Sequence, residues 1–563
     1  MLLPIFDNEP DQRVREIQRK REGYLYGRSL LGNTSHYPEG LLGDAMSMEH
    51  QQRWYEEAQT LKDAVYGEAG MAYMAVAQAG GIQQLSDYQK LYDNQWLTSA
   101  PDGVSEGYLA NFTSDLLFSM ERLSANPYSV HRLHPTASPL PFDVDEDIVA
   151  TLTGWNLRTL HRNGHLFFVD HSYQSRYPTA EGKYTDATMA YFYIHPRTSE
   201  FLPLAIKTMA DLVYTPLDRP NEWLLAKAMF NQNDLFAGQI LHLANSHAVG
   251  EIVHLAALRT MSDKHPVMAL LHRLMHQVYA VRPIANLILF NSTDGLFDQS
   301  FAITNLGVRQ FATEFYPSAG RFQSNYFYSD LLSRGLLNCT YGPPLKHFPF
   351  FSDASTIHTS IRRFVASFVH AYYPSPRFLA LDHELQSWIA EATLHAGVLD
   401  FPASPLTSHA VLIDILSHLA YLNSVSHNVL NGAELFQVSG TLPLHPAALY
   451  HPPPTTKGAH DINIMKYLPP LQESIQHVSL VAFFGPTFSD KERMLVDMFA
   501  GEEVFGRGSL EGVRVAARRF KREMMAFSKE VQGRRLDAGG MWGGMPFVWR
   551  ALDPVGVPYF LNV

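Results

Sequence analysis

The stretch from Asn221 to Gln277 constrains the fold more than any other part of the chain. Its leucines, alanines and methionines recur at three- and four-residue intervals, and its first proline is Pro266. This pattern predicts a helix that is apolar around most of its circumference, and such helices are buried in the core of a large protein. We therefore expect a mainly helical protein organised around this segment.

Three histidines, His242, His247 and His254, lie within this apolar helix. A buried polar group without a partner costs about 1–3 kcal/mol, so these imidazoles need partners. A metal ion is one such partner, and hydrogen bonds within the core are the alternative. Positions five apart on a regular helix are rotated by about 140°, too far to hold one ion. We predict a π-type turn that brings His242 and His247 to one side. His247 and His254, seven apart, share a face without distortion and form the rival pair.

A second set of polar residues lies near the end of a later predicted helix. His427 and Asn431 are four positions apart, just before Gly432, and therefore share one helix face. An asparagine at a helix end also fits a cap. The chain then closes with an apolar, proline-spaced segment that ends in Val563. We expect this terminus to be buried, and a buried carboxylate needs a positive partner such as a metal ion.

Composition excludes several classes of protein. The 44 basic and 55 acidic residues give a net charge of −11, which disfavours binding to nucleic acid or to anionic membranes. No apolar stretch reaches the roughly 18 residues of a membrane span. Cys339 is the single cysteine, which excludes disulfides within the chain, iron–sulfur clusters and multi-thiolate zinc sites. The first residues lack a secretory signal pattern, so we expect a cytoplasmic protein, with secretion as the alternative.

No linker divides the chain, and we expect one continuous domain in which residues 1–100 form a helical arm packed on a catalytic domain at 101–563. Residues 1–40 look irregular, and aromatic runs between His165 and Leu212 predict a small antiparallel sheet. The segment Arg514–Lys529 has a basic helical face that we expect to be solvated. Further helices are expected at residues 48–80, 111–127, 356–372, 381–392, 406–428 and 510–531.

Several of these segments together resemble the lipoxygenase family. HLANSH with the following AVGEIVHLAALRTMSDKHP resembles the family's central two-histidine helix, and SHNVLN resembles its third-histidine helix. SDLLFSMERLSANP and LDHELQSWIAEA resemble further recurrent segments, and Val563 fits the family's terminal Ile or Val. The resemblance covers most of the chain. It implies a large helical catalytic domain with a small antiparallel sheet, without the β-barrel domain of plant and animal members. This compact form is that of the fungal branch.

The resemblance also implies a metal site, and it selects His242 over His254 as the partner of His247. The ligands that it implies are His242, His247, His427, Asn431 and the carboxylate of Val563. Gln239, one turn before His242, is expected to hydrogen-bond Asn431 and to orient its amide. Three imidazoles, an amide oxygen and a carboxylate suit iron or manganese.

The implied reaction removes a hydrogen atom from the bis-allylic methylene of linoleic or linolenic acid and adds O2 to give a hydroperoxide. Ala285 matches the family position that influences stereochemistry and oxygen entry. Leu289 and Phe290 are expected to clamp the pentadiene, and Phe483 and Phe484 to line the tunnel. Core packing is the alternative for each aromatic.

Iron is the favoured metal and manganese the alternative. Some manganese members carry an arginine at the position of Phe483 and a glycine at that of Ala285, and they tend to be secreted, whereas this chain shows no secretory signal pattern. We expect a monomer. Two other classes of function remain open. A helical zinc hydrolase is disfavoured because zinc sites rarely take five protein ligands. Such a hydrolase would also leave the apolar tail without a role. The other class is a helical fatty-acid-binding protein without redox chemistry, in which the core histidines are satisfied by hydrogen bonds.

Overall fold

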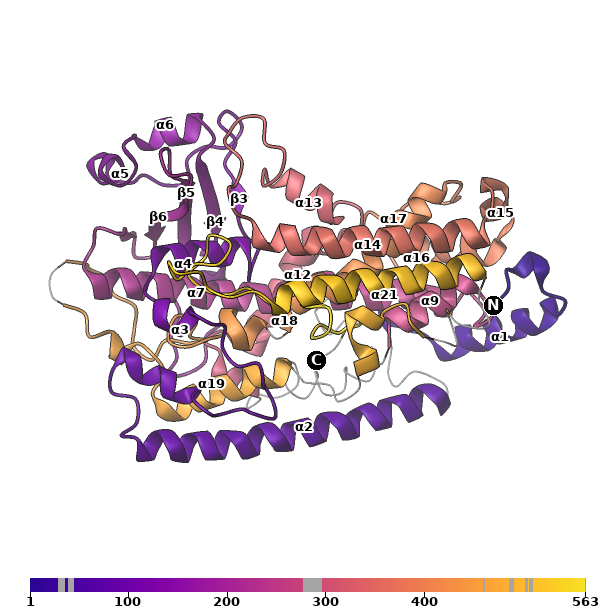
Figure 1. Ribbon diagram of the computed structural model, residues 1–563, viewed down its shortest axis with the longest axis horizontal. Coiled ribbons are helices and arrows are strands. Elements are labelled where there is room, and N and C mark those ends of the chain that lie inside the picture. Colours follow the sequence, from indigo (N-terminus) through magenta and orange to yellow (C-terminus); the bar gives the residue numbers. More distant parts are fainter. Residues whose placement is uncertain are drawn as a thin grey trace.

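The computed structural model describes residues 1–28, 36–38, 45–276, 296–432, 434–458, 461–485, 491–501, 505 and 510–561. Long helices run along the body and a small sheet lies at one end (Figure 1). One large core cluster includes residues from Leu3 to Phe560, so segments from both ends of the chain contribute to it. The predicted fold class, mainly helical with a small antiparallel sheet, is confirmed.

The central helix forms as predicted. α7 (Pro220–His242) starts with a proline in its first turn, where the missing N–H costs nothing. A π-helical turn, η5 (Leu243–His247), leads directly into α8 (Ala248–Leu258). Nearly every residue of these three segments is buried. The apolar pattern around the whole circumference therefore reflects a helix enclosed on all sides.

A second interrupted helix lies against the first. α17 (His409–Tyr421) passes through another π turn, η7 (Leu422–Ser426), into α18 (His427–Asn431), and α18 packs on α7. α14 (Pro349–Tyr372) packs on α17 and on α21 (Glu511–Gln532). α21 buries Val513 and Phe520 and leaves Arg518 exposed, so its basic face is solvated as expected.

The sheet is antiparallel, with the order β3-β4-β5-β6-β7. Its strands are β3 (His131–Arg132), β4 (Leu166–Asp170), β5 (Met189–Ile194), β6 (Phe201–Lys207) and β7 (Val213–Tyr214). Some side chains of the sheet, including Phe167 and Phe192, join the main core. Others, including Phe168 and Tyr191, join a smaller cluster with residues of α5 and α6. The sheet predicted between His165 and Leu212 is therefore present, with short edge strands added.

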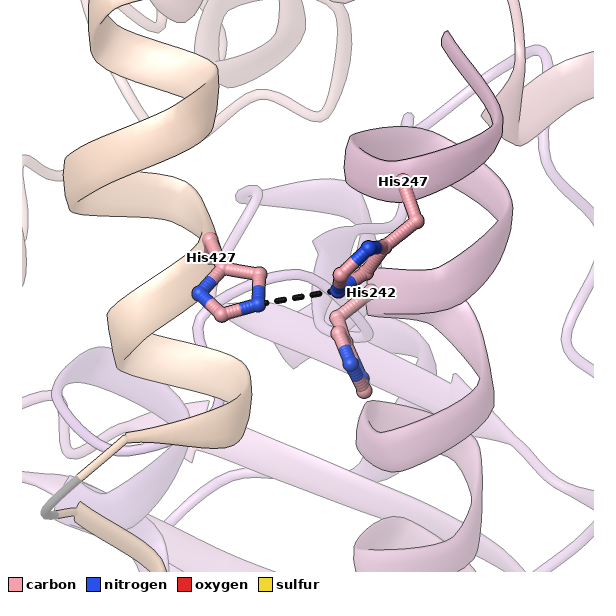
Figure 2. Close-up of side chains that lie close together, drawn as sticks. All are labelled: His242, His247 and His427. Carbon is pink, nitrogen blue, oxygen red and sulfur yellow. Dashed lines mark hydrogen bonds between the residues drawn. The ribbon is translucent and has the colours of Figure 1, made fainter. Parts of the chain in front are cut away.

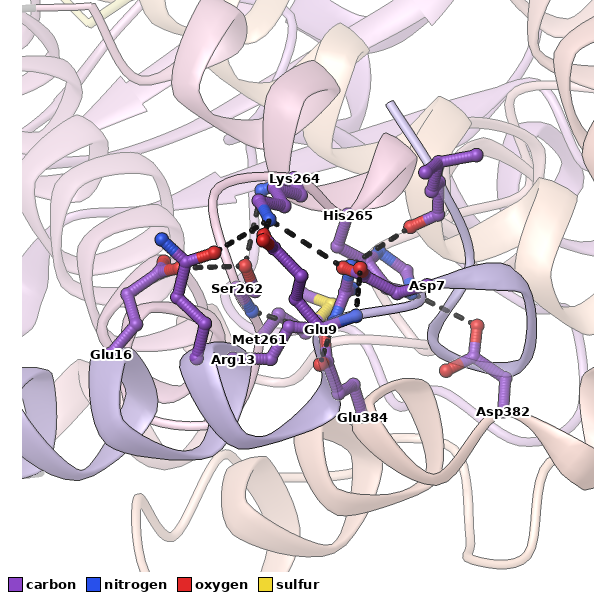
Figure 3. A network of polar contacts seen from close by, with 12 residues as sticks. Asp7, Glu9, Arg13, Glu16, Met261, Ser262, Lys264, His265, Asp382 and Glu384 are labelled. Atoms are coloured by element: carbon purple, nitrogen blue, oxygen red, sulfur yellow. Dashed lines mark hydrogen bonds and ion pairs between the residues drawn. The ribbon is translucent and has the colours of Figure 1, made fainter.

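The N-terminal segment is more regular than predicted. α1 (Pro10–Gly23) lies against the body, and its Arg13 is buried in a polar network (Figure 3). The Arg13 guanidinium binds the Glu384 carboxylate at 2.7 Å and Asp7 at 2.9 Å. The ion pair with the distant Glu384 fixes the arm, and the sequence pattern of residues 1–40 could not reveal it. Before β3, the strands in the described part of the chain are β1 (Tyr26–Arg28) and β2 (His36–Pro38), which form a two-stranded pair and no barrel. The division at residue 100 stays a prediction.

Most predicted helices occur with shifted ends. The helix expected at 111–127 is shorter: α4 (Asp115–Met120), capped by Ser114, gives way to a 3-10 turn at Glu121–Leu123, where Arg122 turns inward to Asp234. No helix in the described residues is long and apolar enough to cross a membrane. The other helices are α2 (Ala45–Gln78), α3 (Tyr108–Asn111), α5 (Glu146–Thr153), α6 (Leu157–Arg162), α9 (Pro266–Leu274), α11 (Leu296–Ser300), α12 (Asn305–Ala319), α13 (Phe327–Ser333), α15 (Pro376–Leu381), α16 (His383–Leu394) and α19 (Leu471–Phe484).

Candidate metal centre

Two π turns aim histidines into the space between the two interrupted helices. The N–H of Ala248 bonds the carbonyl of Leu243, five residues earlier, and the N–H of His427 bonds that of Leu422 in the same way. Each added residue rotates the helix enough to turn the next side chain toward the neighbouring helix. The predicted π turn between His242 and His247 is confirmed. The one before His427 was not predicted.

His242, His247 and His427 converge on one point (Figure 2). Their ligand nitrogens all lie within 4.8 Å of one another, and all three residues are buried. The Nε2 atoms of His247 and His427 are 3.1 Å apart, although these residues are 180 positions apart in sequence. Ring nitrogens of three buried imidazoles facing one small space form a site for a metal ion.

Two of the three imidazoles, those of His242 and His427, are held in the form that binds metal. Burial holds the pKa of His242 well below the ordinary value for histidine, and the neighbouring His247 lowers it further. Burial also holds the pKa of His427 well below that value, with smaller contributions from His247 and His242. Both rings are therefore neutral at neutral pH, and neutral imidazole is the ligand for a metal ion.

The polar atoms left without partners fit a bound ion. Asn431 is buried, one turn after His427, and neither polar atom of its side chain has a hydrogen-bond partner among the described residues. Such a carboxamide would cost about 1–3 kcal/mol per group if it stayed unpaired. The amide oxygen would no longer be unpaired if it bound the metal ion. The donor set of three imidazoles and one amide oxygen therefore fits a non-haem metal.

Gln239 differs from its predicted contact. Its side-chain amide donates to the backbone carbonyl of Leu430 at 2.6 Å and not to the Asn431 side chain. The carbonyls in the last turn of α18 lack partners within the helix, so Leu430 offers a strong acceptor. Gln239 thus fixes the backbone next to Asn431, whereas the expected orientation of the amide itself is not observed.

The rival histidine lies elsewhere. His254 is buried one turn beyond Glu251 and packs its ring against His272 at a centroid distance of 5.4 Å. It is not part of the three-histidine cluster. His265 also lies away from the cluster: it caps α9, and its Nε2 atom lies 2.9 Å from the Asp382 carboxylate.

The predicted tunnel is only partly within the described chain. Phe483 and Phe484 are buried on α19, and their lining role stays a prediction. Ala285, Leu289, Phe290 and Val563 lie outside the described residues. The last described residue of the tail is buried: Leu561 is fully enclosed, and a Cβ on Gly250 of α8 would lie 3.3 Å from its Cδ1 atom. The tail therefore runs beside α8, which begins directly after His247.

Two polar residues of the site were not predicted. The Glu251 carboxylate, on the turn after His247, lies 3.2 Å from Nδ1 of that histidine. A carboxylate on this nitrogen fixes the ring and directs Nε2 toward the metal. The Asn428 amide donates to the carbonyl of Pro558 at 3.0 Å and ties the tail to α18. A glutamate four residues after a candidate ligand, inside an apolar helix, is the signal that could have found Glu251.

Replacing Glu251 with glutamine is expected to weaken metal binding by about 10- to 100-fold, because the amide keeps the shape but loses the charge that supports His247. Competition with a chelator measures this directly. Glu434→Gln is the matched control: Glu434 is equally buried, and its carboxylate has no hydrogen-bond partner among the described residues. Equal metal retention in both variants would contradict a role for Glu251 in holding His247.

Comparison with known proteins identifies the family to which the chain is similar. The lipoxygenase family profile matches residues 143–483. The chain is 51% identical to a manganese lipoxygenase of Fusarium oxysporum over 100% of its own length and 92% of that protein. It is 48% identical to a manganese lipoxygenase of Pyricularia oryzae, over 100% and 91% of the two chains. A solved structure of a manganese lipoxygenase superimposes with a TM-score of 0.97 at 47% identity, covering 100% of both chains.

The chain therefore belongs to the lipoxygenase family. It is a dioxygenase of polyunsaturated fatty acids, and its three-histidine cluster is a non-haem metal site. The zinc hydrolase and the non-catalytic fatty-acid-binding protein are thereby set aside.

Proposed function

We propose that this lipoxygenase uses manganese and oxygenates C18 polyunsaturated fatty acids such as linoleic acid. The observation that carries the choice of metal is the near-half identity, over the whole chain, to fungal proteins named manganese lipoxygenases. The family profile supports the fatty-acid substrate. This proposal departs from the iron favoured on sequence. The preference for iron depended in part on Ala285 and Phe483, because some manganese members have glycine and arginine at these two positions.

We assign the metal to His242, His247, His427, Asn431 and the terminal carboxylate of Val563. When bound, the metal supplies the one-electron chemistry that removes the bis-allylic hydrogen. The protein keeps the imidazoles of His242 and His427 neutral by burial and fixes His247 through Glu251. Burial of all three histidines also keeps the site away from bulk solvent. The tunnel roles of Ala285, Leu289, Phe290, Phe483 and Phe484 remain part of this proposal, as do the monomeric state and the cytoplasmic location.

Metal reconstitution tests the proposal. Protein stripped of metal is loaded with Mn²⁺ or, without oxygen, with Fe²⁺, and the metal content is measured by elemental mass spectrometry. Absorbance of the conjugated diene then reports turnover of linoleic acid. We expect about one manganese per chain and diene formation with manganese, and at least about tenfold less turnover with iron.

The other outcomes test the choice of metal and the lipoxygenase reaction separately. Full activity with iron alone would overturn manganese but keep the lipoxygenase reaction. Stoichiometric zinc without diene formation under any loading would contradict the assignment of the three-histidine cluster to this reaction.

A further inference from the structure

The outer face of α2 is apolar where a surface helix is normally charged. On the inner side, Val65, Ala69, Ala72 and Val76 follow at intervals of four, three and four and are buried in the core. The opposite side is exposed and also apolar. Its large side chains are Tyr66, Met71, Tyr73 and Met74, with exposed fractions of 44%, 64%, 37% and 56%. We call Tyr66, Gly67, Gly70, Met71, Tyr73, Met74 and Ala77 the outer α2 face.

This face carries no charge. Between Ala64 and Gly81 the one charged residue is Glu68, and it points inward. Its carboxylate accepts hydrogen bonds from the backbone N–H groups of Thr98 and Ser99 at 2.6 and 3.0 Å. A helix that is apolar on both sides is normally enclosed by protein or by lipid. Contiguous exposed apolar surface of this kind marks an interaction site.

The face is open as well as apolar. A Cβ placed on Gly67 or Gly70 would meet no atom within 4 Å. Figure 1 shows α2 as a long straight helix along one edge of the molecule, with α19 beside it. No described segment covers the outer side of α2 between Tyr66 and Ala77.

We propose that the outer α2 face docks on a neutral lipid surface, from which the enzyme draws its fatty acid. The substrate class argues for lipid, because polyunsaturated fatty acids partition into membranes and droplets and not into water. The chemistry of the face fits this occupant: tyrosine prefers the boundary between water and lipid, and methionine adapts to a fluid apolar phase.

Charge defines the kind of lipid. The chain carries a net charge of −11, and the outer α2 face offers no basic side chain to an anionic headgroup. Binding therefore depends on apolar insertion and is insensitive to salt and to the fraction of anionic lipid. The basic face of α21 would behave in the opposite way, because it would require anionic lipid.

The position of α2 connects the lipid to the metal site. α2 packs along α19, the helix that carries Phe483 and Phe484. Delivery of substrate along this route depends on the proposed tunnel role of those two residues. Docking itself depends only on the exposed face of α2.

Vesicle binding of the metal-loaded enzyme tests the proposal. Phosphatidylcholine vesicles are sedimented with wild-type protein and with the double variant Met71→Glu/Met74→Glu. We expect the wild type to bind and the double variant to bind at least about tenfold more weakly, because two charges would have to enter the lipid. Val515→Glu/Met525→Glu is the matched control: these residues are 50% and 48% exposed on α21, so the same two charges are added away from the outer α2 face. Its binding is expected to equal that of the wild type.

A gain of binding and a kinetic comparison complete the test. Gly70→Leu adds apolar surface in open space and is expected to increase vesicle binding several-fold. The double variant should keep its rate on dispersed linoleic acid and lose at least about fivefold on the same acid presented in vesicles. This comparison separates docking from catalysis, since a failure of the lipoxygenase reaction would remove both rates.

Three results would overturn the proposal. The first is no binding of wild type to phosphatidylcholine. The second is binding that appears only with phosphatidylserine and weakens with salt, which would assign docking to the basic face of α21. The third is a dimer of the wild type, in solution without lipid, that the double variant abolishes, which would assign the face to a second copy of the chain.

Discussion

Replacing His427 with alanine is expected to remove the metal and to lower fatty-acid oxygenation by more than about 100-fold. Outer partners of metal ligands already contribute 10- to 100-fold to affinity, and a direct ligand contributes more. The Nε2 atom of His427 lies 3.1 Å from that of His247, so its loss opens one side of the cluster. Elemental analysis and the conjugated-diene rate measure the two effects separately.

Stability provides an independent measurement of the same prediction. Metal bound to the folded state raises the Tm, so chelation should lower the Tm of the wild type and leave that of His427→Ala unchanged. His418→Ala is the matched control, because His418 is also a buried histidine on the same interrupted helix and packs on Phe322 and Tyr326 away from the cluster. It should lose stability but keep its metal. Full metal content in His427→Ala would contradict the three-histidine site.

Local sequence pattern was sufficient for the central helix and for its distortion. The apolar periodicity of residues 221–277 predicted a buried helix, and the five-residue spacing of His242 and His247 required a π turn if both were to hold one ion. The structure has both features. The rival pairing of His247 with His254 failed because two turns of regular helix separate the two residues by about 10 Å along the axis, too far for one ion, and His254 packs against His272.

Features set by contacts between distant segments could not be predicted in this way. The π turn before His427 has no comparable histidine spacing to indicate it. The Gln239 side chain could reach either the Asn431 amide or a nearby backbone carbonyl, and only the crossing of α7 and α18 decides between them. The burial of Arg13 likewise depends on Glu384, which is 371 positions away. None of these local patterns decides whether the metal is iron or manganese.

Buried polar atoms without partners connect metal binding to the packing of the two interrupted helices. Asn431 is buried, and both polar atoms of its carboxamide lack a hydrogen-bond partner among the described residues. Without a metal these groups make the folded protein less stable. We therefore infer that metal binding and correct packing of the two interrupted helices are coupled, and this coupling extends to the tail that lies against α8.

Adding three residues, Gly-Ser-Gly, after Val563 is expected to abolish metal binding and activity. The preceding tail is tightly enclosed: Leu561 is fully buried and lies against Gly250 of α8, three residues after His247. The Asn428 amide holds the tail through the carbonyl of Pro558 at 3.0 Å. An extension would move the terminal carboxylate away from its proposed position and would force new residues into a packed core.

The same three residues placed before Met1 are the control, because Leu2 is 46% exposed and the chain there has room. Circular dichroism should show equal helix content in both extended proteins, while elemental analysis shows metal only in the N-terminally extended one. Loss of metal with intact helices would separate a lost ligand from a lost fold. A C-terminally extended protein with full metal content and activity would contradict the terminal carboxylate as a ligand. Three histidines and Asn431 would then be left to hold the ion, because the chain has no acidic side chain after Asp553.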